Sequence, residues 1–202
     1  MTASAATLTL RDALVGRSSR TRTVAVVIGG AALIAACAQI SIPLGFTPVP
    51  ITGQTFAVLL VGAGLGTSAG TASTLLYVVA GIAGAPVYAH QEHGWHVFAG
   101  SNGGYLVGFV VAAALTGFLA ERRWDRRFSS SIGALLTGNV VIYLFGVTWL
   151  QHHLHISYAK ALEYGLYPFV PGDTIKLYLA AGALPIAWKL AGRRAPDDRP
   201  GV

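Results

Sequence analysis

One acid and one base near the C-terminal end of the sequence have a spacing that could do chemistry. Asp173 and Lys176 follow the segment Pro168-Phe169-Val170-Pro171-Gly172 and are three residues apart, so on a helix they share a face. Such a pair can accept and donate hydrogen bonds to one ligand. The structural alternative is that Asp173 caps the helix and Lys176 extends to a lipid headgroup. Both interpretations require a helix that begins close to Asp173.

Further polar side chains stand near the ends of other apolar segments. Gln54 follows Pro50, and Asn102 and Tyr105 flank Gly103-Gly104. These residues could line a binding site with Asp173, although Gln54 and Tyr105 could equally belong to an interfacial belt. Asn139 and Tyr143 lie four residues apart, and an asparagine within hydrocarbon more often bonds a neighbouring helix than a ligand.

Two other patterns suggest chemistry that we do not expect. His90, His93 and His96 have three-residue spacing and could bind zinc, but histidines are common in loops, so we expect neither a metal nor a cofactor. The sequence at 66–70 has the G-x-S-x-G form without the strand-to-helix context of a hydrolase. The sequence contains no G-x-x-x-x-G-K-[ST] motif, the phosphate-binding loop of many ATPases, so an ATP-driven step needs a partner protein.

The composition indicates a lipid environment for these residues. Of the 202 residues, 53% are hydrophobic and 11% are charged, against about 25% charged in soluble proteins. From Thr23 through Gln91 there is no Asp, Glu, Lys or Arg, which is enough for several spans of about 20 residues. The net charge of +6 comes from short basic clusters without interleaved aromatic residues, so nucleic acid is not an expected partner. The single Cys37 excludes an intrachain disulfide.

The apolar runs predict an all-α integral membrane protein with six transmembrane helices. A domain at 23–190 lies between cytoplasmic tails at 1–22 and 191–202. The second run has only 13 residues, about 20 Å of helix, so it either tilts little or is re-entrant. The expected spans are 24–42, 54–66, 68–84, 104–120, 131–150 and 174–190.

The distribution of basic residues predicts the orientation, because Lys and Arg are retained in cytoplasmic loops. With the N-terminus inside, 12 of the 14 basic residues face the cytoplasm, and only Lys160 and Lys176 lie outside. The histidines, Glu92, Glu163 and Asp173 then face outward, and we expect a multi-pass protein of the plasma membrane. The basic residues placed inside are Arg11, Arg17, Arg20, Arg22, Arg122, Arg123, Arg126, Arg127, Lys189, Arg193, Arg194 and Arg199.

Small residues recur at four-residue spacing, which allows helices to approach closely. The pattern occurs at Gly62, Gly66 and Gly70 and again at Ala32 and Ala36. Packing within the protein is the usual explanation. For Ala32 and Ala36 the alternative is a docking face for another membrane subunit.

The chain resembles the BioY-type biotin transporters, the substrate-binding S components of energy-coupling factor (ECF) transporters. The resemblance covers residues 32–189 and is carried by three motifs. These are Thr47-Pro48-Val49-Pro50-Ile51-Thr52 with Gln54-Thr55-Phe56, Gly103-Gly104-Tyr105-Leu106 with Gly108-Phe109, and Pro168-Phe169-Val170-Pro171-Gly172-Asp173 with Lys176.

The resemblance implies a six-helix membrane protein, not an enzyme, that binds biotin near its outer face. It implies that Asp173 and Lys176 hold the ligand, with Gln54, Asn102 and Tyr105 as further contacts. Asp173 suits the ureido N–H donors of biotin, while Lys176 could meet either the ureido oxygen or the carboxylate. Aromatic side chains such as Trp149 would cover the apolar part of the ligand.

The resemblance also implies partner proteins. Ala32 and Ala36 correspond to the face that meets a transmembrane coupling subunit, which works with separate ATPases. The sequence leaves open whether the subunit transports alone and whether it forms a homo-oligomer. Two other classes also stay open, an intramembrane enzyme that uses the outer histidines and a metal, and a scaffold subunit without a solute.

Overall fold

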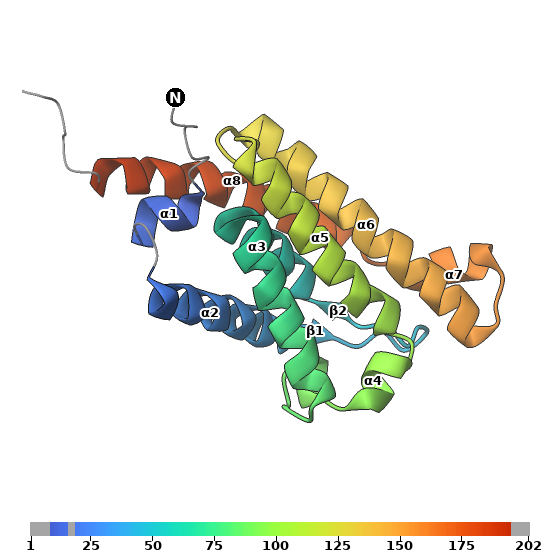
Figure 1. Ribbon diagram of the computed structural model, residues 1–202. Coiled ribbons are helices and arrows are strands. Elements are labelled where there is room, and N and C mark those ends of the chain that lie inside the picture. The colour runs from blue at the N-terminus through green and yellow to red at the C-terminus, as the bar shows by residue number, and fades with distance from the viewer. Residues whose placement is uncertain (1–8, 16–18, 195–202) are drawn as a thin grey trace, which may run out of the picture.

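The computed structural model describes residues 9–15 and 19–194, and most of them are helical (Figure 1). The elements in chain order are α1 (Leu10–Val15), α2 (Arg20–Ala38), β1 (Ser41–Ile42), β2 (Ile51–Thr52), α3 (Gln54–Ile82), the 3-10 helix η1 (Ala89–Gln91), α4 (Trp95–Ala99), α5 (Gly103–Glu121), α6 (Phe128–Leu154), α7 (Tyr158–Gly165) and α8 (Val170–Arg194).

Four of the described helices are long and apolar enough to cross a membrane. These are α2, α3, α5 and α6. Helix α8 has 25 residues but is less apolar, because it carries Asp173, Lys176 and Lys189. The prediction of a helical membrane protein is therefore confirmed at this level.

Helix α3 combines the two segments that the sequence places at 54–66 and 68–84, and it is broken at Gly66. Gly66 has a φ of 81° and a ψ of 175°, a backbone conformation that residues with a Cβ rarely adopt. The helix restarts at Thr67, whose N–H donates to Glu121 Oε1 at 2.8 Å. The carboxylate thus satisfies one of the unpaired N–H groups at the start of the second half.

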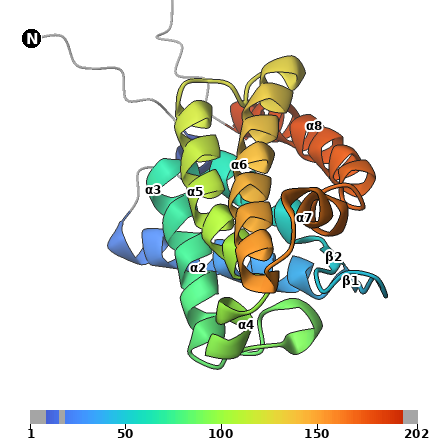
Figure 2. The same cartoon turned by 90° about the vertical axis from the view of Figure 1, so that its right-hand side faces the viewer.

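The bundle is built around α3 and α5. Helix α3 packs against α5 and α2, and α6 packs on the other side of α5 (Figure 1). Helix α8 contacts both α6 and α3. The turn between α5 and α6 lies at one end of the bundle, and α4 lies at the other (Figure 2).

Several connections contain more structure than the sequence predicts. An antiparallel ladder joins β1 and β2, with Ser41 opposite Thr52 and Ile42 opposite Ile51, so the expectation of an all-α chain missed a short sheet. Two-residue strands are too short to show the alternation that identifies a strand. The segment between the expected spans 68–84 and 104–120 contains η1 and α4, and α7 forms between α6 and α8.

The described parts of the expected tails are also helical. Helix α1 lies within the segment 1–22, Leu10 is buried, and α1 packs against α3 and α8. Helix α2 begins at Arg20, where Ser19 Oγ accepts a hydrogen bond from the Arg22 N–H at 3.4 Å. The rest of the tails, at 1–8, 16–18 and 195–202, lies outside the described residues.

Candidate functional site

A pocket of about 620 Å³, which includes its open mouth, lies between the first turns of α3, α5 and α8 and the middle of α6. The segment before α3 and the connection between α3 and α5 complete its wall. All five side chains that the sequence proposes for the ligand line it. They are Gln54, Asn102, Tyr105, Asp173 and Lys176.

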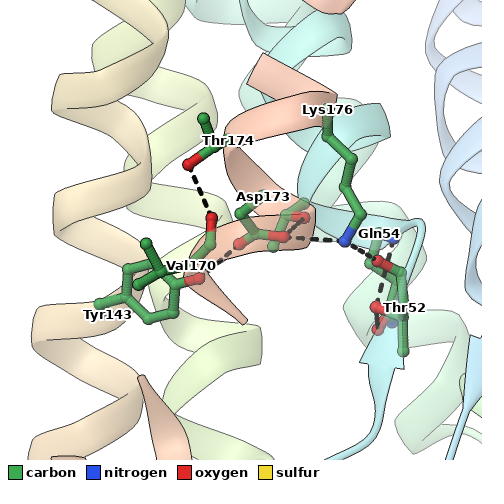
Figure 3. Close-up of polar contacts among 8 residues, drawn as sticks. Thr52, Gln54, Tyr143, Val170, Asp173, Thr174 and Lys176 are labelled. Carbon is green, nitrogen blue, oxygen red and sulfur yellow. Dashed lines mark hydrogen bonds and ion pairs between the residues drawn. The ribbon is translucent and has the colours of Figure 1, made fainter. Parts of the chain in front are cut away.

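Asp173 is at the centre of the polar wall, where three elements meet (Figure 3). It is only 4% exposed. Its Oδ1 accepts hydrogen bonds from Thr55 Oγ1 at 3.1 Å and from Lys176 Nζ at 2.8 Å, and its Oδ2 accepts from Tyr143 OH at 2.5 Å. The carboxylate therefore connects the first turns of α3 and α8 with the middle of α6.

Lys176 compensates this buried charge. Its ammonium group is 2.8 Å from Asp173 Oδ1, and it also donates to the backbone oxygen of Thr52 at 2.5 Å (Figure 3). Two of its three N–H groups thus have acceptors among the described residues. The side chain reaches Thr52 of β2, and Lys176 lines the pocket.

Gln54 is fixed by its neighbours in the wall. It is 7% exposed, its Oε1 accepts from Thr52 Oγ1 at 2.9 Å, and its Nε2 donates to Tyr77 OH. A side chain held at both ends of its amide has a defined orientation before any ligand binds. Gln54 is therefore a rigid part of the pocket.

Tyr105 and Asn102 come from the start of α5. The Tyr105 hydroxyl donates to the Gly165 oxygen at 2.7 Å, and its ring lies against Gly146, where an added Cβ would overlap the ring. Asn102 precedes the first turn of α5 and makes no side-chain capping bond there. Its amide is thus placed at the pocket wall without a capping role.

The pocket wall includes side chains that the sequence does not indicate, and it excludes Trp149. Tyr143, whose spacing to Asn139 indicates only a shared helix face, donates to Asp173 Oδ2, and Glu92, expected to face outward, lines the pocket. Trp149 does not line the pocket, because it follows Tyr143 by six residues and so points about 120° away from it around α6. Its Nε1 donates to the Gly100 oxygen at 2.9 Å instead.

Asn139 lies one helical turn before Tyr143 on α6 and is 8% exposed. It lies with Asp173 and Lys176 beside a narrow gap that has no room for a water molecule. The Asn139 side chain is thus behind the pocket wall. In the described part of the chain, no group of three or more His, Cys, Asp or Glu side chains is arranged to hold a metal ion.

Comparisons with known proteins agree on one family. The model of the BioY family matches residues 6–193. The biotin transporter BioY of Thermotoga maritima is 42% identical over 150 residues, which cover 74% of this chain and 86% of the relative. The biotin transporter BioY of Rhizobium etli is 36% identical over 147 residues, covering 69% of this chain and 78% of the relative.

A solved structure has the same fold. The crystal structure of the S-component for biotin from an ECF-type ABC transporter matches with a TM-score of 0.77 and 28% sequence identity. The match covers 86% of this chain and 95% of the solved chain. This chain therefore belongs to the BioY family.

Proposed function

We propose that this protein is a biotin-binding subunit of the plasma membrane that mediates biotin uptake and is energised by a separate ATPase module. The observation that carries the proposal is the pair Asp173 and Lys176, 2.8 Å apart in the wall of a pocket of about 620 Å³. The family supplies the ligand, since its relatives are biotin transporters. A transporter subunit does not require catalytic residues.

The hydrogen-bonding capacity of Asp173 restricts how biotin binds. A carboxylate has about four acceptor positions, and three of these accept from Thr55, Lys176 and Tyr143. One ureido N–H can bond to Asp173 without displacing a protein group. Lys176 then either donates to the ureido oxygen or compensates the carboxylate of the valeryl chain.

The apolar part of the pocket suits the rest of this ligand. Val49, Val97, Leu106, Phe109 and Phe169 contribute to the lining. Pockets for small molecules are usually lined mainly by hydrophobic side chains, with a few polar groups that set the orientation. Biotin has this division between a polar ureido ring and an apolar chain.

We further propose six membrane crossings with both termini in the cytoplasm. The two halves of α3 on either side of Gly66 each count as one crossing, and α2, α5, α6 and α8 supply the others. An added Cβ at Gly66 would meet Thr9 and Glu121, so the N-terminal segment, the break in α3 and the end of α5 share one end. The excess of arginine at this end supports a cytoplasmic assignment.

The docking face for the coupling subunit is proposed on α2. Ala32 and Ala36 are both exposed. In the most apolar 18-residue stretch of α2, only 22% of the residues are buried, compared with 61% in the corresponding stretch of α5. A helix with small residues and little internal contact is suited to packing against another membrane helix. The arrangement is compatible with assembly on a coupling subunit.

The proposal is tested by measuring biotin binding to the purified protein in detergent. Wild-type protein is expected to bind biotin, and Asp173→Asn to weaken binding more than tenfold because the carboxylate charge beside Lys176 is lost. Glu163→Gln is the matched control, since Glu163 is exposed and pairs with Lys160 on α7. Binding by the control should stay within about twofold of wild type. Absence of biotin binding by wild type would overturn the function, and unchanged binding by Asp173→Asn would overturn the site.

A further inference from the structure

The connection between α3 and α5 covers one side of the pocket, and we call residues 85–102 the lid. Tyr88, Ala89, Glu92 and Val97 of the lid line the pocket, together with Asn102 at its end. The lid contains η1 and α4 and lies at the end of the bundle opposite the turn between α5 and α6 (Figure 2). The lid therefore forms part of the wall that a ligand in the pocket would contact.

Hydrogen bonds tie both ends of the lid to the bundle. Near its start, Tyr88 OH donates to the Val78 oxygen at 2.7 Å, and in its middle the Gly94 N–H donates to the Gly81 oxygen at 2.7 Å. Burial raises the pKa of Tyr88 to about 12, so the phenol keeps its proton at neutral pH. Near the end of the lid, Trp149 Nε1 donates to the Gly100 oxygen at 2.9 Å.

Gln39, which follows α2, also holds the lid through hydrogen bonds of its side chain. Gln39 Nε2 donates to the backbone oxygens of Tyr88 at 3.0 Å and Val87 at 3.4 Å. Gln39 Oε1 accepts from the Gln91 N–H at 3.2 Å. The two ends of one amide thus bond the residue before η1 and the last residue of η1, whose Tyr88 oxygen and Gln91 N–H also bond each other at 3.1 Å. Gln91 and its neighbour His90 have positive φ values of 61° and 56°, a strained conformation that needs such support.

The end of α2 also contacts the other wall of the pocket. The Ile40 oxygen accepts from the Gly53 N–H at 2.9 Å. Gly53 lies between Thr52, whose oxygen accepts from Lys176, and Gln54. The two residues that follow α2 therefore touch both the lid and the backbone beside the polar wall.

We infer that Gln39 is a positioning residue that fastens the lid to the end of α2 and thereby sets how often the pocket opens to its ligand. This inference rests on the proposed function. Gln39 is exposed and does not line the pocket, so it acts through the lid and not by touching the ligand. Because Ala36 lies one turn before Gln39, a subunit that docks on α2 and shifts its end would act on the lid through the same contacts.

Rate measurements with biotin distinguish a lid-holding residue from a ligand contact. If the lid must open for both entry and exit, releasing it raises the association and dissociation rate constants together. Full-length Gln39→Met in detergent is expected to raise both about tenfold and to leave the Kd within about twofold, since tenfold corresponds to about 1.4 kcal/mol, the size of one net hydrogen bond.

Gln151→Met is the matched control. Gln151 also stands near the end of a helix and donates to a loop oxygen, that of Ile156 at 2.9 Å, but it does not line the pocket. Its rate constants should equal those of wild type. A second measurement is amide hydrogen exchange, in which residues 86–94 of Gln39→Met should exchange about tenfold faster while those of α7 are unchanged.

The outcomes separate the inference from the function. Unchanged rates and unchanged exchange in Gln39→Met, with normal biotin binding by wild type, would overturn the inference alone. A faster dissociation with an equal loss of affinity would identify Gln39 as a ligand contact and also overturn it. If Gln39→Met does not fold, Gln39→Glu keeps the size and the acceptor for Gln91 and should show a smaller increase in both rates. Failure of wild type to bind biotin would overturn both the function and the inference.

Discussion

Two pairs of an acid and a base lie near opposite ends of helix α8, and both acids are almost fully buried. Asp173 is 4% exposed and pairs with Lys176, while Asp125 is 1% exposed and lies 3.5 Å from Arg126 Nε. Each acid also accepts a hydrogen bond from an aromatic side chain. Tyr143 donates to Asp173, and Trp188 donates to Asp125. The residue types are thus nearly the same at both sites.

The difference lies in what surrounds each pair. Asp173 and Lys176 face a pocket, whereas Asp125 is covered by Trp188, and the Arg126 guanidinium stacks 3.3 Å above the Trp188 ring. The Asp125 pair thereby fastens α8 to the turn between α5 and α6. Burial and charge alone do not identify a binding site, because a buried ion pair can serve structure. The cavity beside the pair makes Asp173 a candidate for recognition.

The largest expected effect separates the two bases. Lys176→Met keeps much of the side-chain volume but removes the charge beside Asp173, so biotin affinity should fall about 100-fold, within the range for truncating one partner of a buried charge pair. Arg126→Met should change the affinity by less than twofold, because Arg126 does not line the pocket. Titration calorimetry of both variants checks this. Similar losses in the two variants would remove the distinction between the pairs.

The aromatic donors allow a matched test of smaller size. Tyr143→Phe removes one charge-assisted hydrogen bond from Asp173 and is expected to weaken biotin binding about tenfold. Trp188→Phe removes one from Asp125, so it should leave binding unchanged and lower the free energy of unfolding by about 1 to 2 kcal/mol. Binding and thermal unfolding are measured on both variants. Weaker binding in Trp188→Phe would contradict the structural role of its pair.

The polar wall was more predictable from the sequence than the Asp125 pair. The three-residue spacing of Asp173 and Lys176 and the positions of Gln54, Asn102 and Tyr105 near segment ends pointed to one place, and the structure puts all five at one pocket. Their part in binding stays a prediction. The contact of Trp188 with Asp125 joins residues 63 positions apart, and in the sequence the basic loop indicated only topology.

Local patterns also predicted some parts of the fold better than others. The glycine-rich sequence around Gly66 indicated a connection, and the break lies there because Gly66 has a positive φ. The ladder of Ser41–Ile42 with Ile51–Thr52 had no signal, since neither strand is long enough to show a period. Helix α2 ends at Ala38 and not at the expected residue 42, because the chain turns at Gln39 into this ladder.

The smallest expected effect concerns how the Asp125 pair responds to pH. Burial raises the pKa of Asp125 above its ordinary value of 3.8, although Trp188 and Arg126 act in the opposite direction. In the interval between the ordinary and the folded pKa, the folded protein keeps a proton that the unfolded chain has lost. The contribution of Asp125 to stability is therefore complete below about 3.8 and is lost as the pH rises through the folded pKa.

Asp125→Asn removes this titration while keeping an oxygen that accepts from Trp188. The unfolding midpoint of wild type minus that of the variant should therefore fall as the pH rises from about 4 to about 7. Asp12 provides the opposite case. Burial alone would raise its pKa, but hydrogen bonds from Thr9 and Arg11 hold the pKa below 3.8, so its contribution is present above 3.8 and is lost on acidification. For Asp12→Asn the same difference should rise with pH, and slopes of equal sign in the two variants would contradict the charge environment assigned to Asp125.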